Sequence, residues 1–203
     1  MTATPVEAAA AALGAGRAVV LPTDTVYGLC AEAFRAPPVE RLARLKGRPE
    51  GMPIALLVTD VDGLLDCVPE LRGRAAVIAR ALLPGPYTLV LPNPARRFRW
   101  LSAGRPDTIG VRVPLLPADA QAVVERVGAI GATSANAHGA PDPRSVAEIP
   151  PTILDRVAAV IDGGELPGTP STVLDLTRPE PAVLREGAVA ADEALRAVAE
   201  ALS

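Results

Sequence analysis

Short apolar runs alternate with longer amphipathic segments along this 203-residue chain. Segments in which apolar residues recur every three or four positions predict helices, and proline or glycine marks several of their ends. Short, mostly apolar runs between turn residues predict buried strands. The predicted helices span residues 6–13, 38–45, 71–83, 118–127 and 192–202, and the predicted strands span residues 18–21, 54–58, 87–91, 108–113, 129–132, 158–161, 172–176 and 182–184.

The order of these elements predicts an α/β protein with a single domain over residues 1–203. The strands and helices do not follow a strict strand–helix–strand repeat. We therefore expect a mixed, twisted, open sheet with flanking helices. The chain is 49% hydrophobic, so it has enough apolar surface for a core of its own.

Composition and charge argue against several classes of protein. Aromatic residues make up 2% of the chain and the net charge is -3, which disfavours a base-stacking surface and a dedicated duplex-binding protein. One histidine, two cysteines and no CxxC pair argue against a His/Cys metal site. No apolar run is long enough to span a membrane, so we expect a cytoplasmic protein without membrane contact. The basic, partly aromatic run Arg96–Trp100 is expected to be a solvated loop.

Two polar clusters carry the chemistry: Lys46-Gly47-Arg48-Pro49 and, far downstream, Thr133-Ser134-Ala135-Asn136. In an extended segment, residues two positions apart point the same way. We therefore expect Lys46 and Arg48 to face one cavity together with Ser134 and Asn136. Cations beside short hydrogen-bonding groups are typical of a site for a phosphorylated or carboxylated ligand.

The chain has neither a GxxxxGK[ST] nor a GxGxxG loop, so side chains would have to hold a triphosphate. Two further arginines, Arg112 and Arg185, lie in or beside apolar strands, where a charge is costly without a partner. Hydroxyl groups lie at the predicted strand ends, where ligands bind to open sheets. These residues are Thr23, Thr25, Thr108, Ser134, Ser171 and Thr172.

Seven short segments, in order, resemble the motifs of one family: LPTDTVYGL (21–29), KGRP (46–49), PGPYTL (84–89), IGVRVP (109–114), TSAN (133–136), STV (171–173) and LREG (184–187). Over residues 6–189 the chain is similar to the YrdC/Sua5 family of threonylcarbamoyl-AMP synthases. The resemblance implies a YrdC-like fold with a central cationic cavity. It also implies that L-threonine, bicarbonate and ATP form threonylcarbamoyl-AMP and pyrophosphate, for the threonylcarbamoyladenosine at position 37 of tRNA.

The resemblance also implies cofactors and partners. Mg²⁺ is expected with the ATP, without protein ligands that the sequence identifies. A downstream tRNA threonylcarbamoyl transferase would use the product, and a weak contact with tRNA is expected. We expect the chain to be without the additional C-terminal domain of the long members and to resemble the short form.

Site residues follow from the matching motif positions. The family resemblance assigns catalysis to Lys46, Arg48, Ser134 and Asn136. It assigns L-threonine binding to Thr23, Thr25, Arg112, Ala132 and Ser171. It assigns ATP binding to Lys46, Arg48, Met52, Thr108, Ser134, Asn136, Asp142 and Arg185.

Three positions depart from the family pattern. Met52 stands where an amide is common, and Leu57 where a histidine sometimes contacts threonine. Asp142 replaces a hydroxyl that would face the nucleotide, so we expect its carboxylate to point away from the phosphates or to bind through water or Mg²⁺. Two alternatives therefore stay open: a YciO-like nucleotide- or RNA-binding relative without this activity, and a non-catalytic RNA-binding module, which the pI of about 5.3 disfavours.

Overall fold

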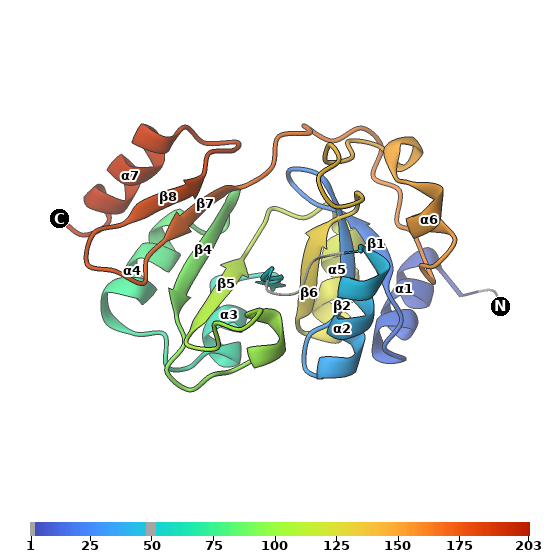
Figure 1. The fold of residues 1–203 in the computed structure, drawn as a ribbon, viewed down its shortest axis with the longest axis horizontal. Helices are drawn as coiled ribbons and strands as arrows, with labels where there is room; N and C mark the ends of the chain where they lie inside the picture. Colours follow the sequence, from blue (N-terminus) through green and yellow to red (C-terminus); the bar gives the residue numbers. More distant parts are fainter. Residues whose placement is uncertain (1–2, 48–51) are drawn as a thin grey trace.

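The protein is described by a computed structural model over residues 3–47 and 52–203. Within these residues, eight strands form one sheet in the order β1-β2-β6-β3-β5-β4-β7-β8 (Figure 1). The strands are β1 (Val19–Pro22), β2 (Tyr27–Glu32), β3 (Ala55–Leu57), β4 (Tyr87–Pro92), β5 (Thr108–Arg112), β6 (Ile130–Ser134), β7 (Thr172–Asp175) and β8 (Ala182–Arg185). The helices are α1 (Pro5–Gly14), α2 (Ala36–Leu45), α3 (Val61–Cys67), α4 (Gly73–Leu82), α5 (Ala118–Val127), α6 (Pro151–Leu154) and α7 (Ala191–Glu200), with 3-10 turns η1 (Arg99–Leu101) and η2 (Val146–Glu148).

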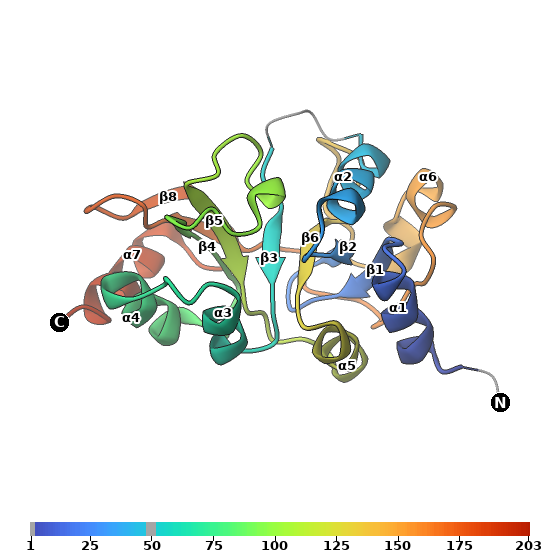
Figure 2. The same ribbon diagram turned by 90° about the horizontal axis from the view of Figure 1, so that it is seen from below.

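The sheet is mixed, which confirms the prediction. β3 pairs with β5 and β4 pairs with β7 in parallel, whereas the other neighbouring pairs of the described sheet are antiparallel. Figure 2 shows β3 in the middle of the molecule, between a half that carries β4, β7 and β8 and a half that carries β1, β2 and β6. The two halves therefore meet at β3 and its neighbours.

Alternate residues of the strands face opposite sides of the sheet. One side contributes buried leucines to the larger apolar cluster, in which residues of α2, α3, α4 and α7 also take part: Leu29, Leu56, Leu89 and Leu174. The other side contributes short or small residues to a cavity: Gly28, Ala55, Thr88, Gly110 and Val173. The same period of two thus builds a core on one side and a hollow on the other.

Helices α1 and α5 cover part of the cavity side. Leu13 of α1 and Val123 of α5 pack with Val19 and Cys30 in a second, smaller apolar cluster. Ala132 belongs to this cluster and also lines the cavity. The cavity therefore lies on the same side of the sheet as α1 and α5, over strands that these helices leave open.

The structure corrects the predicted elements in several places. Strand β2 was not predicted, although it is buried along its whole length and pairs with both β1 and β6. The predicted strand over residues 158–161 is wrong: that segment forms backbone hydrogen bonds with residues 18 and 20, but its one β-bridge is the isolated bridge between Val160 and Val20. Helices α3 and α6 were also missed, and both are short.

Two further sequence expectations bear on the surface and the cysteines. Among the described residues, no helix is long and apolar enough to cross a membrane. Both cysteines have free thiols: Cys30 is fully buried, as predicted, whereas Cys67 is only half-buried.

Candidate active site

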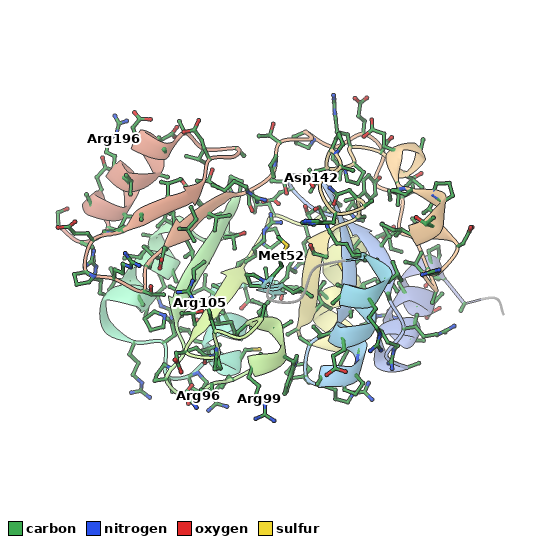
Figure 3. The ribbon with its side chains drawn as sticks, in the orientation of Figure 1. Met52, Arg96, Arg99, Arg105, Asp142 and Arg196 are labelled. Atoms are coloured by element: carbon green, nitrogen blue, oxygen red, sulfur yellow. The ribbon has the colours of Figure 1, made fainter. Side chains whose placement is uncertain are left out.

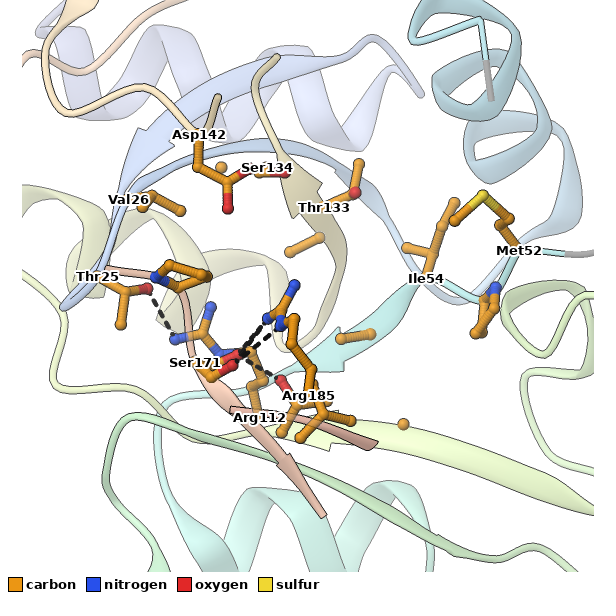
Figure 4. A pocket seen from close by; sticks show the side chains of 18 of the residues that line it. Thr25, Val26, Met52, Ile54, Arg112, Thr133, Ser134, Asp142, Ser171 and Arg185 are labelled. Carbon is orange, nitrogen blue, oxygen red and sulfur yellow. Dashed lines mark hydrogen bonds between the residues drawn. The ribbon is translucent and has the colours of Figure 1, made fainter. Parts of the chain in front are cut away.

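A cavity of about 540 Å³ opens on the side of the sheet that α1 and α5 partly cover (Figure 4). Its volume lies within the range of small-molecule sites, about 300–1,000 Å³. Small residues make its floor, and Gly110 illustrates why. A Cβ atom built on Gly110 would have its nearest contact at 3.8 Å, with Thr88 Cγ2. The glycine therefore leaves volume in the cavity that a side chain would fill, and it is not needed to avoid a steric clash.

Lys46 is placed by the end of α2. This helix buries Val39 and Leu42 and ends at Leu45, so that Lys46 is its C-cap and Gly47 adopts a left-handed φ of 63°. Glycine adopts this conformation at the lowest cost, and it is common directly after a helix. The expectation that Lys46 belongs to an extended segment is therefore wrong, although its side chain does line the cavity. Arg48, its expected companion, lies outside the described residues.

The ammonium of Lys46 meets the second polar cluster at the end of β6. Lys46 is only 6% exposed, and its Nζ donates to Ser134 O at 2.5 Å, to Ser134 Oγ at 3.1 Å and to Asn136 Oδ1 at 2.7 Å. Ser134 Oγ also donates to Asn136 Oδ1 at 2.8 Å, and Asn136 Nδ2 donates to Ala140 O at 2.5 Å. Asn136 thus connects the lysine to the loop that follows β6.

The turn between β1 and β2 carries two buried threonines with different tasks. Thr23 Oγ1 donates to Val26 O at 2.8 Å and accepts the N–H groups of Thr25 at 3.2 Å and Val26 at 3.3 Å. Because the only hydroxyl proton of Thr23 is used on Val26, Thr25 Oγ1 is the donor in their 3.0 Å contact. Thr23 therefore shapes the turn, and Thr25 faces onward to Arg112.

Arg112, the last residue of β5, forms a buried ion pair with Asp24. Its Nη2 lies 2.7 Å from Asp24 Oδ1 and 3.2 Å from Thr25 Oγ1, and the side chains of Arg112 and Asp24 are each 10% exposed. Burial lowers the pKa of Arg112, which Asp24 opposes and nearby Arg185 reinforces. Burial likewise raises the pKa of Asp24, and Arg112 opposes that rise. Each charge therefore depends on the other for its compensation.

Ser171 and Arg185 form the part of the wall next to Arg112 (Figure 4). Arg185 Nη2 donates to Ser171 O at 2.8 Å and to its Oγ at 3.3 Å, and Ser171 Oγ lies 2.8 Å from Thr88 Oγ1. The chain after Arg185 passes so close to β7 that a Cβ on Gly187 would lie 2.1 Å from Pro170 O. Glycine at 187 is therefore what lets β8 bring Arg185 to Ser171.

A family model of the Sua5/YciO/YrdC domain, described as "Telomere recombination", matches residues 11–187. The chain belongs to the Sua5/YciO/YrdC family. It is 34% identical to the threonylcarbamoyl-AMP synthase of Pyrococcus abyssi over 91% of its own length and 54% of that protein. Its fold matches a crystal structure of P. abyssi Sua5 complexed with L-threonine, with a TM-score of 0.86 and 33% identity, over 98% of this chain and 59% of that one. It also matches E. coli YciO, with a TM-score of 0.80 and 30% identity, over 92% of both chains. The YrdC-like fold expected from the sequence is thereby confirmed, and the chain spans about half the length of the P. abyssi relative.

The remaining family positions can now be placed. Ala132, Thr108, Met52 and Asp142 all line the cavity, and the position of the Asp142 carboxylate relative to bound phosphates stays a prediction. Figure 3 shows Met52 and Asp142 near the centre of the molecule, whereas Arg96 and Arg99 lie at its lower margin. Leu57 is 1% exposed and packs in the smaller apolar cluster, and it is not among the described residues that line the cavity.

Several lining or supporting residues were not assigned from the sequence, and Asp24, Thr88, Arg105 and His138 are examples. Thr88 had a usable signal, because it alternates with the buried Tyr87 and Leu89 along β4. His138 and Arg105 lie in loops, where no periodicity reveals the direction of a side chain. No sequence signal pointed to Asp24, since its partner Arg112 lies 88 residues away along the chain.

The described residues contain no group of three or more His, Cys, Asp or Glu side chains that could hold a metal ion. Asp142 is the one carboxylate among the described residues that line the cavity. A single carboxylate fits Mg²⁺ that arrives on a nucleotide, because that ion takes most of its ligands from phosphates and water. It does not fit a resident ion in an all-protein cage.

Proposed function

We propose that this chain is an L-threonylcarbamoyladenylate synthase, a nucleotidyltransferase that acts on L-threonine, bicarbonate and ATP. The single observation that carries the proposal is the lining of the cavity. Four basic side chains, those of Lys46, Arg105, Arg112 and Arg185, converge on its described wall with one carboxylate, Asp142. All three substrates carry negative charge, so such a wall favours their assembly and stabilises charge that develops between them. The names of the family relatives support the same activity.

The buried end of the cavity suits the amino acid. Arg112 presents a guanidinium that can donate a charge-assisted hydrogen bond to a carboxylate. Thr25 and Ser171 supply hydroxyls beside it, and Ala132 offers a small surface and its backbone groups. Because Thr23 uses its hydroxyl within the turn, we assign it the support of Thr25 rather than a contact with L-threonine. The L-threonine complex of P. abyssi Sua5 supports an amino-acid site in this fold.

The end of the cavity nearer to β6 suits the nucleotide. Lys46, Ser134 and Asn136 form a hydrogen-bonded cluster there, and we assign it to the phosphates. Thr108, Met52 and Arg185 line the remaining wall and are assigned to ATP on family resemblance. We assign Arg48 to the same group, on its motif alone.

Mg²⁺ on the triphosphate would supply charge neutralisation at the leaving pyrophosphate. Asp142 is the residue we assign to hold it, directly or through water, because an unneutralised carboxylate would repel the phosphates. Lys46 and Arg185 would orient the phosphate chain whether or not the ion is present.

The chemistry needs no covalent nucleophile from the protein. The amine of L-threonine adds to the carbon of bicarbonate, and loss of water gives a carbamate. A carbamate oxygen then attacks the α-phosphorus, and the bond to the β-phosphate oxygen breaks as pyrophosphate leaves. The basic wall holds the reactants in line and accepts the charge that moves to the leaving group. We further propose that a tRNA threonylcarbamoyl transferase uses the adenylate. A weak contact with tRNA and a cytoplasmic location stay predictions.

A pyrophosphate-release assay tests the proposal. Release is expected only when L-threonine, bicarbonate and ATP are all present, and omission of any one should stop it. ATP binding without release under the full mixture would instead favour the YciO-like alternative, a nucleotide- or RNA-binding relative without this activity.

A further inference from the structure

Asp24 and Arg112 form an ion pair that is nearly buried yet incompletely bonded. The one described bond between them joins Nη2 to Oδ1 at 2.7 Å. Asp24 Oδ2 and Arg112 Nε are both buried and without a hydrogen-bond partner. Buried polar atoms are rarely left unsatisfied, and such atoms in native proteins often mark functional positions.

The two unsatisfied atoms match each other chemically. Nε–H is a donor and Oδ2 is an acceptor, and they belong to the same two groups that already share one bond. Nε and Nη2 form one edge of the guanidinium, which is the edge that takes a carboxylate in two parallel bonds. The second proton of Nη2 goes to Thr25 Oγ1 at 3.2 Å. Asp24 and Thr25 therefore hold Nη2 with both of its protons, which leaves Nη1 for a ligand.

The placement of the two residues separates their tasks. Arg112 lines the cavity, whereas Asp24 is not among the described lining residues. Arg112 also lies close enough to Arg185 for the two positive charges to repel each other. If Arg112 had no carboxylate partner, repulsion from Arg185 would favour a conformation in which its guanidinium turns away from Arg185 and from the cavity wall. The ion pair with Asp24 opposes that movement.

We propose that Asp24 is a positioning residue for the carboxylate of the amino-acid substrate: it fixes the Nε/Nη2 edge of Arg112 so that Nη1 faces the cavity. This inference rests on the proposed function, since it takes L-threonine as the ligand of Arg112. If so, L-threonine affinity should depend more on a correctly placed hydrogen-bond acceptor at position 24 than on a negative charge there.

Four variants test it by calorimetric titration of L-threonine and, separately, of ATP. Asp24→Leu removes the acceptor, Asp24→Asn keeps an Oδ1 acceptor without the charge, and Asp24→Glu keeps the charge but displaces it by one methylene. Glu32→Leu is the matched control, because Glu32 is also buried and paired with an arginine, at 2.8 Å from Arg35, but does not line the cavity.

Asp24→Leu and Asp24→Glu should each raise the L-threonine dissociation constant about 10- to 100-fold, the loss of one charge-assisted hydrogen bond. Their ATP dissociation constants should change less than about 3-fold, since Asp24 does not reach the phosphates. Asp24→Asn should bind L-threonine within about 3-fold of the unsubstituted protein even though its melting temperature falls, because Arg112 loses its counter-ion. Glu32→Leu should lose melting temperature without losing affinity.

Unchanged L-threonine affinity in both Asp24→Leu and Asp24→Glu overturns the inference, as does an equal loss in Glu32→Leu. If Asp24→Leu does not fold, Asp24→Glu and Asp24→Asn decide the question alone. Failure of the unsubstituted protein to bind L-threonine contradicts the proposed function instead. The Nε–H signal of Arg112 in NMR spectra, assigned by comparison with Arg112→Lys, tests whether Nε pairs with the carboxylate of Asp24. Slow exchange of this proton with solvent in the unsubstituted protein, together with fast exchange in Asp24→Asn, supports the pairing. Fast exchange in both proteins overturns it.

Discussion

Replacing Lys46 by methionine removes the ammonium from the cavity wall and keeps an unbranched side chain that adapts to its surroundings. The described acceptors of Nζ are Ser134 O, Ser134 Oγ and Asn136 Oδ1, at 2.5, 3.1 and 2.7 Å. Asn136 Oδ1 keeps the hydroxyl of Ser134 as a donor, at 2.8 Å, so the cluster loses its centre without losing every bond.

Two magnitudes decide what Lys46→Met should do. Loss of a hydrogen bond to a charged group costs about 1.5–3 kcal/mol, which for a chain of this size lowers the melting temperature by about 3–12 °C. Loss of a charge that stabilises the transition state costs about 2–4 kcal/mol, or about 30- to 1000-fold in rate. The variant should therefore fold and yet lose nearly all pyrophosphate release at a temperature well below its transition.

Arg41→Met is the matched control. Arg41 lies on the same helix and donates to the backbone oxygen of Gly16 at 2.8 Å, but it is not among the described lining residues. It should keep activity within about 2-fold, as expected for a substitution remote from the chemistry. Pyrophosphate release within about 3-fold of normal in Lys46→Met would refute the assignment of Lys46 to the phosphates.

Four other outcomes follow from the cavity. Gly110→Val should fill the floor without a backbone clash, since its Cβ contacts only Thr88 at 3.8 Å, and should lower turnover at least about 10-fold with an unchanged melting temperature; turnover within about 3-fold of normal would contradict this. Mg²⁺ should raise the ATP affinity less in Asp142→Ser than in the unsubstituted protein, as measured by calorimetry with Mg²⁺ or with EDTA. An equal gain in the two proteins would show that Asp142 does not hold the Mg²⁺. Arg185→Ala should raise the ATP dissociation constant about 10- to 100-fold, and Arg185→Lys should recover only part of it, because an ammonium cannot replace a planar fork; identical constants would remove Arg185 from the site. L-Threonine should be preferred over L-valine by at least about 100-fold in pyrophosphate release, with L-serine between them, and equal turnover would mean that Thr25 and Ser171 do not recognise the substrate hydroxyl.

The elements with a clear period were predictable from the sequence. Helix α5 has the predicted bounds, Ala118–Val127, because its apolar residues recur at helical spacing before Gly128. Strand β2 was missed because all six of its residues are buried, so no alternation of polar and apolar positions marks it. The segment over residues 158–161 is apolar enough for a strand and lies along residues 18–20, but only Val160 forms a β-bridge. How far a segment pairs with its neighbour depends on the tertiary structure, which the apolar pattern does not reveal.

The candidate site was predictable to the extent that motif positions determine it. Lys46, Ser134 and Asn136 do meet, but the geometric reason differs: Lys46 caps a helix, and only Ser134 ends a strand. The carboxylate behind Arg112 could not be predicted, because Asp24 and Arg112 become neighbours only when β5 and the turn after β1 come together. The direction of the Asp142 side chain also depends on the tertiary structure, since a residue in a loop has no periodic pattern that predicts where its side chain points.

The central claim is that L-threonine, bicarbonate and ATP react in one cavity to form threonylcarbamoyl-AMP. Mass spectrometry of the product formed from L-threonine, ATP and ¹³C-labelled bicarbonate tests it most directly. The expected product is threonylcarbamoyl-AMP that carries the label, and it should disappear when Lys46 is replaced by methionine. ATP turned over without a labelled adenylate, or a labelled adenylate formed equally well by Lys46→Met, would contradict it.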